Sequence, residues 1–142
     1  MGLLDKFKKS PKRNKDSGTM LERYWKSFNH AIDGIIYGIR YEHNMVIIIM
    51  CTILVTILGF SYHISNYEWL FIITVCGLIA ACEMINSSIE ATIDLITTEY
   101  SPLAKIAKDT ASAASLLLCL TALIGGLIIF VPKIFLLGVI LW

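Results

Sequence analysis

Residues 83–112 read EMINSSIEATIDLITTEYSPLAKIAKDTAS, and the apolar runs on either side of this stretch decide the fold. The fourteen residues before Glu83 carry no charge, and neither does the run 113–132. At about 1.5 Å rise per residue, fourteen helical residues reach roughly 21 Å into a hydrocarbon core about 30 Å thick. The pattern therefore predicts two membrane-spanning helices joined by a polar turn, with Glu83 well inside the bilayer.

Four polar side chains of this stretch share one face of the predicted helix. Glu83, Asn86, Glu90 and Asp94 follow one another at spacings of three, four and four residues. An ionisable group at the centre of a membrane costs about 3 kcal/mol on the insertion scale, and such groups usually serve a function or pair with one another. A functional site on this face is therefore expected.

The chemistry of this face fits a metal-assisted reaction. Converging carboxylates repel unless a cation neutralises them, and Mg²⁺ prefers one or two carboxylates together with phosphate oxygens. Phosphoryl transfer needs mainly positioning and charge neutralisation, and Lys108 and Arg23 could contact phosphate. The residues alone also leave ion or proton transport and purely structural pairing open. Neither a Walker motif nor a kinase-type G-x-G-x-x-G occurs in the chain.

The composition supports a membrane protein of one domain. The chain has 142 residues, of which 56% are hydrophobic and 16% charged, and its mean hydropathy is +0.70. Nine of the twelve Lys and Arg residues fall in residues 1–40, but the apolar remainder argues against a soluble protein that binds nucleic acid. The four cysteines lie in apolar runs without C-x-x-C spacing, so a zinc or redox motif is not indicated.

Hydropathy and charge predict an all-α membrane protein with an N-terminal amphipathic surface helix. The expected parts are a basic cytoplasmic arm (1–19) and a membrane domain (20–142) with a surface helix (20–40) and three spans (43–61, 68–98, 103–131). Pro132 and Lys133 are expected to mark the far interface. The loop 61–68 has no Lys or Arg, which places the N-terminus in the cytoplasm. Residues 134–142 are either an extension of the last helix or an anchor in the outer leaflet, and no role is assigned to His30 or His63.

Three strings in this chain, EMINSSIEATID, TEY and AKDTASAA, resemble the prokaryotic diacylglycerol kinase family. Its pattern reads E-x-x-N-[ST]-[AS]-I-E-x-x-x-D, then E-Y, then A-K-D-x-[AG]-[SA]-A-A, and the match covers residues 20 to about 131. The resemblance implies a homotrimeric bundle of three-span protomers that uses ATP and Mg²⁺ to phosphorylate a lipid alcohol. One departure is His43-Asn44-Met45, which stands where the family often has a Phe-Arg pair.

Carried over position by position, the resemblance assigns a role to most of the polar motif residues. Glu83 is implied as the general base, with Asn86 and Ser112 as substrate-binding or orienting residues, and Glu42 and Glu90 as magnesium ligands. The residues implied to contact ATP are Arg23, Glu42, Glu90, Glu99, Tyr100, Lys108 and Asp109.

The acceptor that the resemblance implies is undecaprenol or diacylglycerol. The long basic arm and the Ile- and Lys-rich composition favour undecaprenol, with undecaprenyl phosphate as the product, in the inner membrane of a bacterial cell. A membrane carrier of ions or protons is the alternative of a different class.

Overall fold

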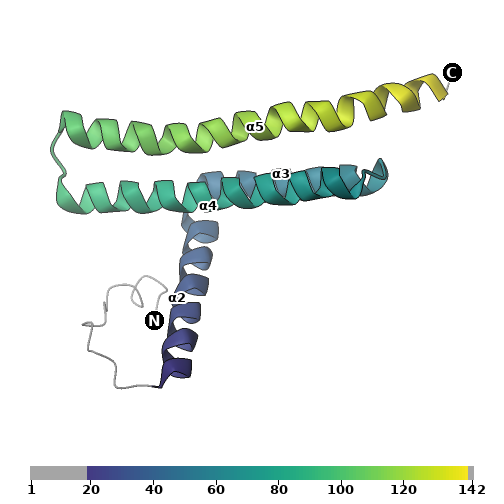
Figure 1. Cartoon of the computed structure of the whole chain (residues 1–142). Coiled ribbons are helices and arrows are strands. Elements are labelled where there is room, and N and C mark those ends of the chain that lie inside the picture. Colours follow the sequence, from purple (N-terminus) through teal and green to yellow (C-terminus); the bar gives the residue numbers. More distant parts are fainter. Residues whose placement is uncertain (1–18, 141–142) are drawn as a thin grey trace. The chain divides into compact units, whose positions relative to one another are not determined.

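The computed structural model describes residues 19–140, with side chains described through residue 136, and shows an all-helical chain (Figure 1). The helices are α2 (Met20–Tyr41), α3 (His43–Ser61), α4 (Asn66–Ile96) and α5 (Pro102–Ile140). The contacts divide the chain into two units, residues 1–35 and residues 36–142, and each is described by itself. The predicted basic arm lies outside the described residues except for Thr19.

Three of the helices are long and apolar enough to cross a membrane, in agreement with the predicted number of spans. They are α3, α4 and the part of α5 up to Leu136. Hydroxyl groups inside them donate back to the carbonyl four residues earlier, as Thr52 does to Ile48 and Thr121 does to Leu117. These bonds satisfy polar side chains within their own helix, where lipid offers no partner.

Helix α2 occupies the predicted surface-helix segment. Thr19 and Glu22 start it with reciprocal bonds, because the Glu22 backbone N–H donates to Thr19 Oγ1 and the Thr19 N–H donates to Glu22 Oε2. Such a capping box satisfies two backbone donors that a helix start leaves open. The location of this helix at the membrane surface stays a prediction.

Helix α3 ends in a turn whose backbone N–H groups donate to carbonyls in the last turn of the helix. The N–H of Ile64 donates to the Gly59 carbonyl at 3.1 Å, and the N–H of His63 donates to the Phe60 carbonyl at 3.3 Å. His63 has a φ of 48°, the left-handed conformation that this pair of bonds requires at a helix end. The turn buries Ile64 against the helices and reverses the chain into α4.

A capping box starts α4 immediately after this turn. Ser65 Oγ accepts from the Glu68 backbone N–H, and the Glu68 carboxylate accepts from the Ser65 N–H at 2.6 Å. The other Glu68 oxygen lies 3.0 Å from Lys133 Nζ, so the turn is also tied to α5. Polar bonds therefore fix the position where the predicted loop 61–68 joins the two spans.

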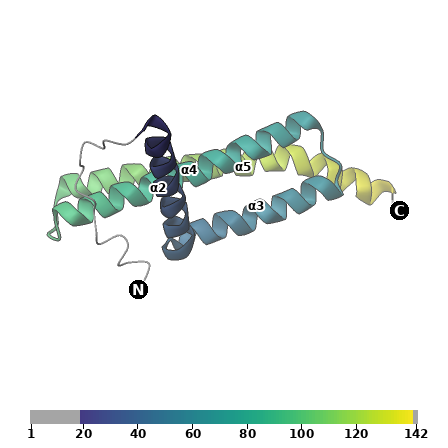
Figure 2. The same cartoon turned by 90° about the horizontal axis from the view of Figure 1, so that it is seen from below.

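Helices α4 and α5 pack side by side and antiparallel, and α3 packs against α4 over a shorter stretch (Figures 1 and 2). Near the α3–α4 turn, the buried side chains Ile64, Ile72, Ile129 and Phe130 form an apolar core. A Cβ at Gly125 would lie 2.1 Å from Phe71 Cζ, so the absence of a side chain there lets the two helices approach closely.

Helix α5 continues past the predicted end of the third span. The sequence suggested an end at residue 131, but the helix runs to Ile140 with Pro132 inside it. A proline removes one backbone hydrogen bond from a helix. Leaving the helix would expose further backbone groups with no water to bind them, so membrane helices tolerate proline better than a helix in water does.

Glu83 lies past the middle of α4, and its depth in a membrane stays a prediction. It stands 17 residues after Asn66, about 26 Å along α4. Its carboxylate contacts Asn44 in the first turn of α3, level with the start of the apolar run. Beyond Glu83, α4 and α5 continue together past the start of α3 (Figure 2).

Candidate active site

Acidic and amide side chains line a cavity of about 320 Å³ between α3, α4 and α5. Its polar lining consists of Asn44, Glu83, Asn86, Glu90, Ser112 and Ser115. Glu83 is 5% exposed and Asn86 is 6% exposed, although both are polar. Burying a carboxylate is costly unless it is hydrogen-bonded, so the partners of Glu83 and Glu90 matter for the fold as well as for function.

Each carboxylate of this cavity accepts a hydrogen bond from one asparagine. Asn44 Nδ2 donates to Glu83 Oε1 at 2.7 Å, from α3 to α4. Asn86 Nδ2 donates to Glu90 Oε1 at 3.0 Å, within α4. Ser112 Oγ of α5 lies 3.4 Å from Asn86 Oδ1, within hydrogen-bond distance. All three spans therefore contribute to holding the two carboxylates in place.

A second cavity, of about 550 Å³, lies where α4 turns into α5. Two ion pairs line it, Lys108 with Asp94 across the two helices and Lys105 with Asp109 along α5. Its other lining residues include Glu99 and Tyr100. The cavity is therefore lined by two cations and three carboxylates.

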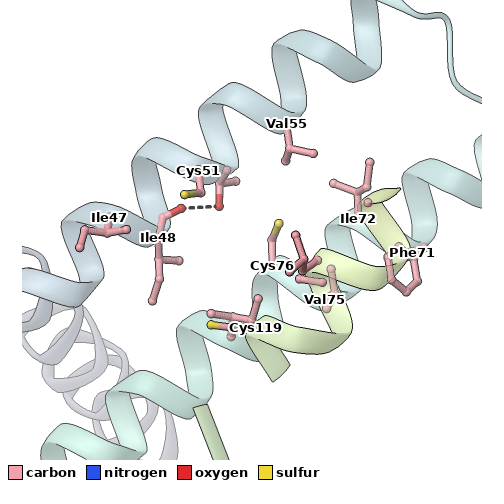
Figure 3. Close-up of a pocket in the computed structure, with 14 residues that line it drawn as sticks. Ile47, Ile48, Cys51, Val55, Phe71, Ile72, Val75, Cys76 and Cys119 are labelled. Carbon is pink, nitrogen blue, oxygen red and sulfur yellow. Dashed lines mark hydrogen bonds between the residues drawn. The ribbon is translucent and has the colours of Figure 1, made fainter. Parts of the chain in front are cut away.

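An apolar groove of about 350 Å³ lies on the other side of the carboxylate cavity, between α3, α4 and α5 (Figure 3). Cys51 and Val55 of α3, Val75 and Cys76 of α4, and Cys119 of α5 are among its lining residues, and Figure 3 shows them around one space. The groove shares Ile47, Ile48 and Cys119 with the carboxylate cavity. The two spaces are therefore adjacent.

The structure brings the predicted site residues together in two groups. Glu83, Asn86, Glu90 and Ser112 line the first cavity. Glu99, Tyr100, Lys108 and Asp109 line the second. Asn86, expected beside Glu83, donates its hydrogen bond to Glu90 instead.

Two predicted residues are not part of either group. Glu42 is the half-buried N-cap residue of α3, and it does not line the cavity that holds Glu83 and Glu90. Arg23 belongs to the other unit of the chain, so its place at the phosphates stays a prediction. Among the described residues of one chain, no three His, Cys, Asp or Glu side chains group closely enough to hold a metal ion.

Sequence reasoning missed Asn44, Ser115 and Lys105. Asn44 bonds to Glu83, Ser115 lines the same cavity, and Lys105 pairs in the second cavity. The sequence did hold one signal for Asn44, a polar residue in the first turn before an apolar run. Its partner, however, lies 39 residues further along the chain and cannot be read from local spacing.

These features define a class of protein. Three helices able to span a membrane surround the buried Glu83 and the half-buried Glu90, with an apolar groove on one side and a charged cavity on the other. An enzyme that joins a membrane-dissolved substrate to a charged, water-soluble one needs this combination. A carrier of ions or protons would use the carboxylates without needing the groove.

Comparisons with known proteins identify the family. The family model described as prokaryotic diacylglycerol kinase matches residues 29–130. The undecaprenol kinase of Bacillus subtilis (strain 168) is 40% identical over 121 residues, 85% of this chain and 98% of that protein. Diacylglycerol kinases of Helicobacter pylori (strain ATCC 700392 / 26695) and Pseudomonas aeruginosa are 36% and 32% identical, each over 68% of this chain and 75% and 78% of their own lengths.

The chain therefore belongs to the prokaryotic diacylglycerol kinase family, as the motif resemblance suggested. The prediction of a lipid kinase is confirmed by the family and by these relatives. Membership in a kinase family implies ATP as the co-substrate. The carboxylates that could equally have served a carrier thus belong to a phosphotransferase.

Proposed function

We propose that this protein transfers the γ-phosphoryl group of ATP to the hydroxyl of undecaprenol, with Mg²⁺ as cofactor. The observation that carries the proposal is the order of three spaces along α4. The apolar groove lies beside Val75, the carboxylate cavity beside Glu83 and Glu90, and the charged cavity beside Asp94. In this order a lipid tail, its hydroxyl and a nucleotide fit one after another.

In the proposed reaction Glu83 is the general base. Its carboxylate takes the proton of the acceptor hydroxyl while the hydroxyl oxygen bonds to the γ-phosphorus and the bond to ADP breaks. Glu83 meets the requirement for position, because it lines the cavity next to the groove and is nearly excluded from solvent. Lys108, in the charged cavity, would contact the phosphates.

Glu90 and Glu42 would hold the magnesium ion. A cluster of three protein carboxylates is not needed, because Mg²⁺ is usually bound by one or two carboxylates together with substrate phosphates and water. Glu90 fits this role because it lines the cavity between Glu83 and the charged end. The ion would neutralise charge on the transferred phosphoryl group.

Glu42 points to an assembly of several copies. Within one chain it does not line the cavity that contains Glu90. We propose a homotrimer in which a neighbouring protomer supplies Glu42 to complete the magnesium site. The exposed apolar side chains of the spans leave room for such packing in the membrane. We place the trimer in the bacterial inner membrane with the N-terminus in the cytoplasm, where the basic residues are expected.

The groove and the relatives together favour undecaprenol as the acceptor. The match to the undecaprenol kinase covers nearly all of that protein, whereas the matches to diacylglycerol kinases cover about three quarters of theirs. The lining of the groove is almost entirely apolar and suits a hydrocarbon tail. Diacylglycerol is the second candidate, because several of the relatives are named for it.

The direct test is a comparison of acceptors. Purified protein in detergent receives labelled ATP, Mg²⁺ and either undecaprenol, diacylglycerol or no lipid, with assembly checked by cross-linking. We expect rapid labelling of undecaprenol and slower labelling of diacylglycerol. Labelling of diacylglycerol alone would replace the acceptor, and no labelled lipid from assembled protein would refute the proposal.

A second experiment fills the groove. Gly126 lines it, and nothing lies within 4 Å of a Cβ built there, so Gly126→Leu adds bulk without a clash inside the chain. We expect the KM for undecaprenol to rise about tenfold or more while the KM for ATP stays unchanged. Gly77→Leu is the matched control, because Gly77 also has open space but does not line the groove. Equal behaviour of both variants would exclude the groove as the tail site.

A further inference from the structure

The proposed reaction gives Asn44 no role, yet this residue contacts the proposed base directly. Its side chain crosses from the first turn of α3 to α4 and donates to Glu83 Oε1 at 2.7 Å. We infer that Asn44 is a positioning residue, which fixes the Glu83 carboxylate so that its other oxygen faces the acceptor hydroxyl. The inference rests on the proposed function, because it gives Glu83 the task of accepting the proton.

The hydrogen bond from Asn44 occupies one oxygen of the Glu83 carboxylate and leaves the other for the reaction. A carboxylate has two oxygens, and each can accept more than one hydrogen bond. Within the described part of the chain, Oε1 accepts from Asn44 and Oε2 accepts no side-chain hydrogen bond. Oε2 is therefore the oxygen left to take a proton. A bond between an amide and a charged carboxylate is short and strong, so it restricts rotation of the carboxylate group.

The other polar side chains near Glu83 do not take over the hydrogen bond that Asn44 makes to it. Asn86 lies on the same helix as Glu83, but its amide donates to Glu90 and its carbonyl oxygen lies near Ser112. Ser115 lines the cavity, and its hydroxyl is directed to Cys82 Sγ at 3.6 Å. The other polar groups of the cavity are therefore engaged elsewhere, and orienting Glu83 falls to Asn44.

The orientation of the Glu83 carboxylate affects the rate of the proposed reaction. A general base must be within hydrogen-bond reach of the proton that it takes, so a small misorientation of Glu83 would slow the reaction. Asn44 donates to Glu83, whereas Glu90 accepts its hydrogen bond from Asn86 and Lys108 lines the other cavity, so a change at Asn44 leaves these proposed nucleotide contacts in place. A loss of Asn44 should therefore lower kcat and leave the KM for ATP unchanged.

The experiment uses a variant of Asn44 that keeps the shape of the side chain but accepts hydrogen bonds where asparagine donates them. Asn44→Asp replaces the NH₂ donor by an oxygen, which repels Glu83 instead of binding it. We expect kcat with undecaprenol to fall about 10- to 100-fold, the range expected for a lost hydrogen bond to a charged group. The KM for ATP should stay within about twofold of the original.

Two further variants separate positioning from stability. Asn44→Gln keeps the amide donor on a longer arm, and we expect a kcat between those of the unchanged protein and Asn44→Asp. Thr56→Val is the matched control on α3. The substitution removes the hydrogen bond from Thr56 to the Thr52 carbonyl. Thr56 lines neither the groove nor the carboxylate cavity, so kcat should be unchanged. Cross-linked trimers and melting temperature report folding for each variant.

The outcomes distinguish the inference from the proposed function. If the unchanged protein labels no lipid, the proposed function fails. If it is active and Asn44→Asp keeps its kcat, only the role of Asn44 is overturned. Equal losses in Asn44→Asp and Asn44→Gln would also overturn it, because a donor at position 44 would then make no difference. A graded loss with an unchanged KM for ATP supports positioning.

Discussion

At the end of the α3–α5 bundle where α3 turns into α4, isoleucine and phenylalanine side chains fill the space between the helices. At the other end, the corresponding space is lined by carboxylates, amides and hydroxyls. The apolar end loses little by being buried, whereas the buried Glu83 and the half-buried Glu90 each accept a hydrogen bond from an asparagine. The difference indicates that one end holds the helices together and the other carries the chemistry.

The turn regions of the two ends differ in the same way. Backbone hydrogen bonds and the Ser65–Glu68 capping box fix the α3–α4 turn. The α4–α5 turn instead borders the charged cavity, where lysine side chains pair with Asp94 and Asp109. Salt bridges at exposed positions contribute little stability and can exchange partners. The second turn is therefore suited to admit a charged ligand.

The largest effect should come from the polar end. Glu83→Gln keeps the shape of the side chain and removes its ability to take a proton. We expect kcat to fall about 100- to 10,000-fold, the usual contribution of a general base. Nucleotide binding, measured directly, should persist, and the melting temperature should not fall, because a buried charge is removed. Retained turnover would remove Glu83 from the role of base.

The matching change at the apolar end should affect stability and leave chemistry intact. Phe130 is buried and meets Tyr62 edge-on, with ring centroids 6.2 Å apart. We expect Phe130→Ala to destabilise the folded state by about 3–5 kcal/mol in a denaturant titration in detergent, because a cavity forms. Phe135, which is 70% exposed, offers the control Phe135→Ala. A lowered kcat per folded protein would show that the two ends are coupled.

A smaller effect is expected in the charged cavity. Asp94 is the anion that Lys108 contacts here, and the side chain of Asp94 is 66% exposed. If Lys108 binds phosphate, Asp94→Asn should free it and lower the KM for ATP up to about fivefold, because exposed pairs are worth up to about 1 kcal/mol. Steady-state kinetics with varied ATP measure this. A raised KM would mean that Asp94 itself helps to bind the nucleotide.

The smallest effect concerns the turn at the apolar end. His63 adopts a φ of 48°, which glycine reaches without steric cost. We expect His63→Gly to raise the stability by about 0.5 kcal/mol, since part of the gain is offset by the greater freedom of glycine in the unfolded chain. The melting temperature in detergent measures the change, and kcat should not move. A lower melting temperature would mean that the imidazole makes a stabilising contact.

The sequence predicted the three spans because a single physical requirement, enough apolar length to cross the bilayer, fixes them. It also predicted that Glu83, Asn86 and Glu90 share a helix face, since this follows from the period of one helix. It did not predict the end of α5, because Pro132 reads as a stop in water but not among membrane-spanning residues.

Contacts between helices could not be predicted from the pattern. The pairs Asn44–Glu83 and Lys108–Asp94 join residues that are 39 and 14 positions apart, and the period of each helix says nothing about which faces meet. The motif resemblance supplied the roles, and the structure shows which of those residues share a cavity.

The most direct test of the acceptor site is a photolabelling experiment. A long prenol with a diazirine on one of its first isoprene units is irradiated with the protein, and the labelled peptides are mapped by mass spectrometry. We expect labels on the groove, on peptides that contain Val55, Val75 or Cys119, and competition by undecaprenol. Labels confined to lipid-facing positions such as Ile128, with none in the groove, would contradict the delivery of a membrane alcohol to Glu83.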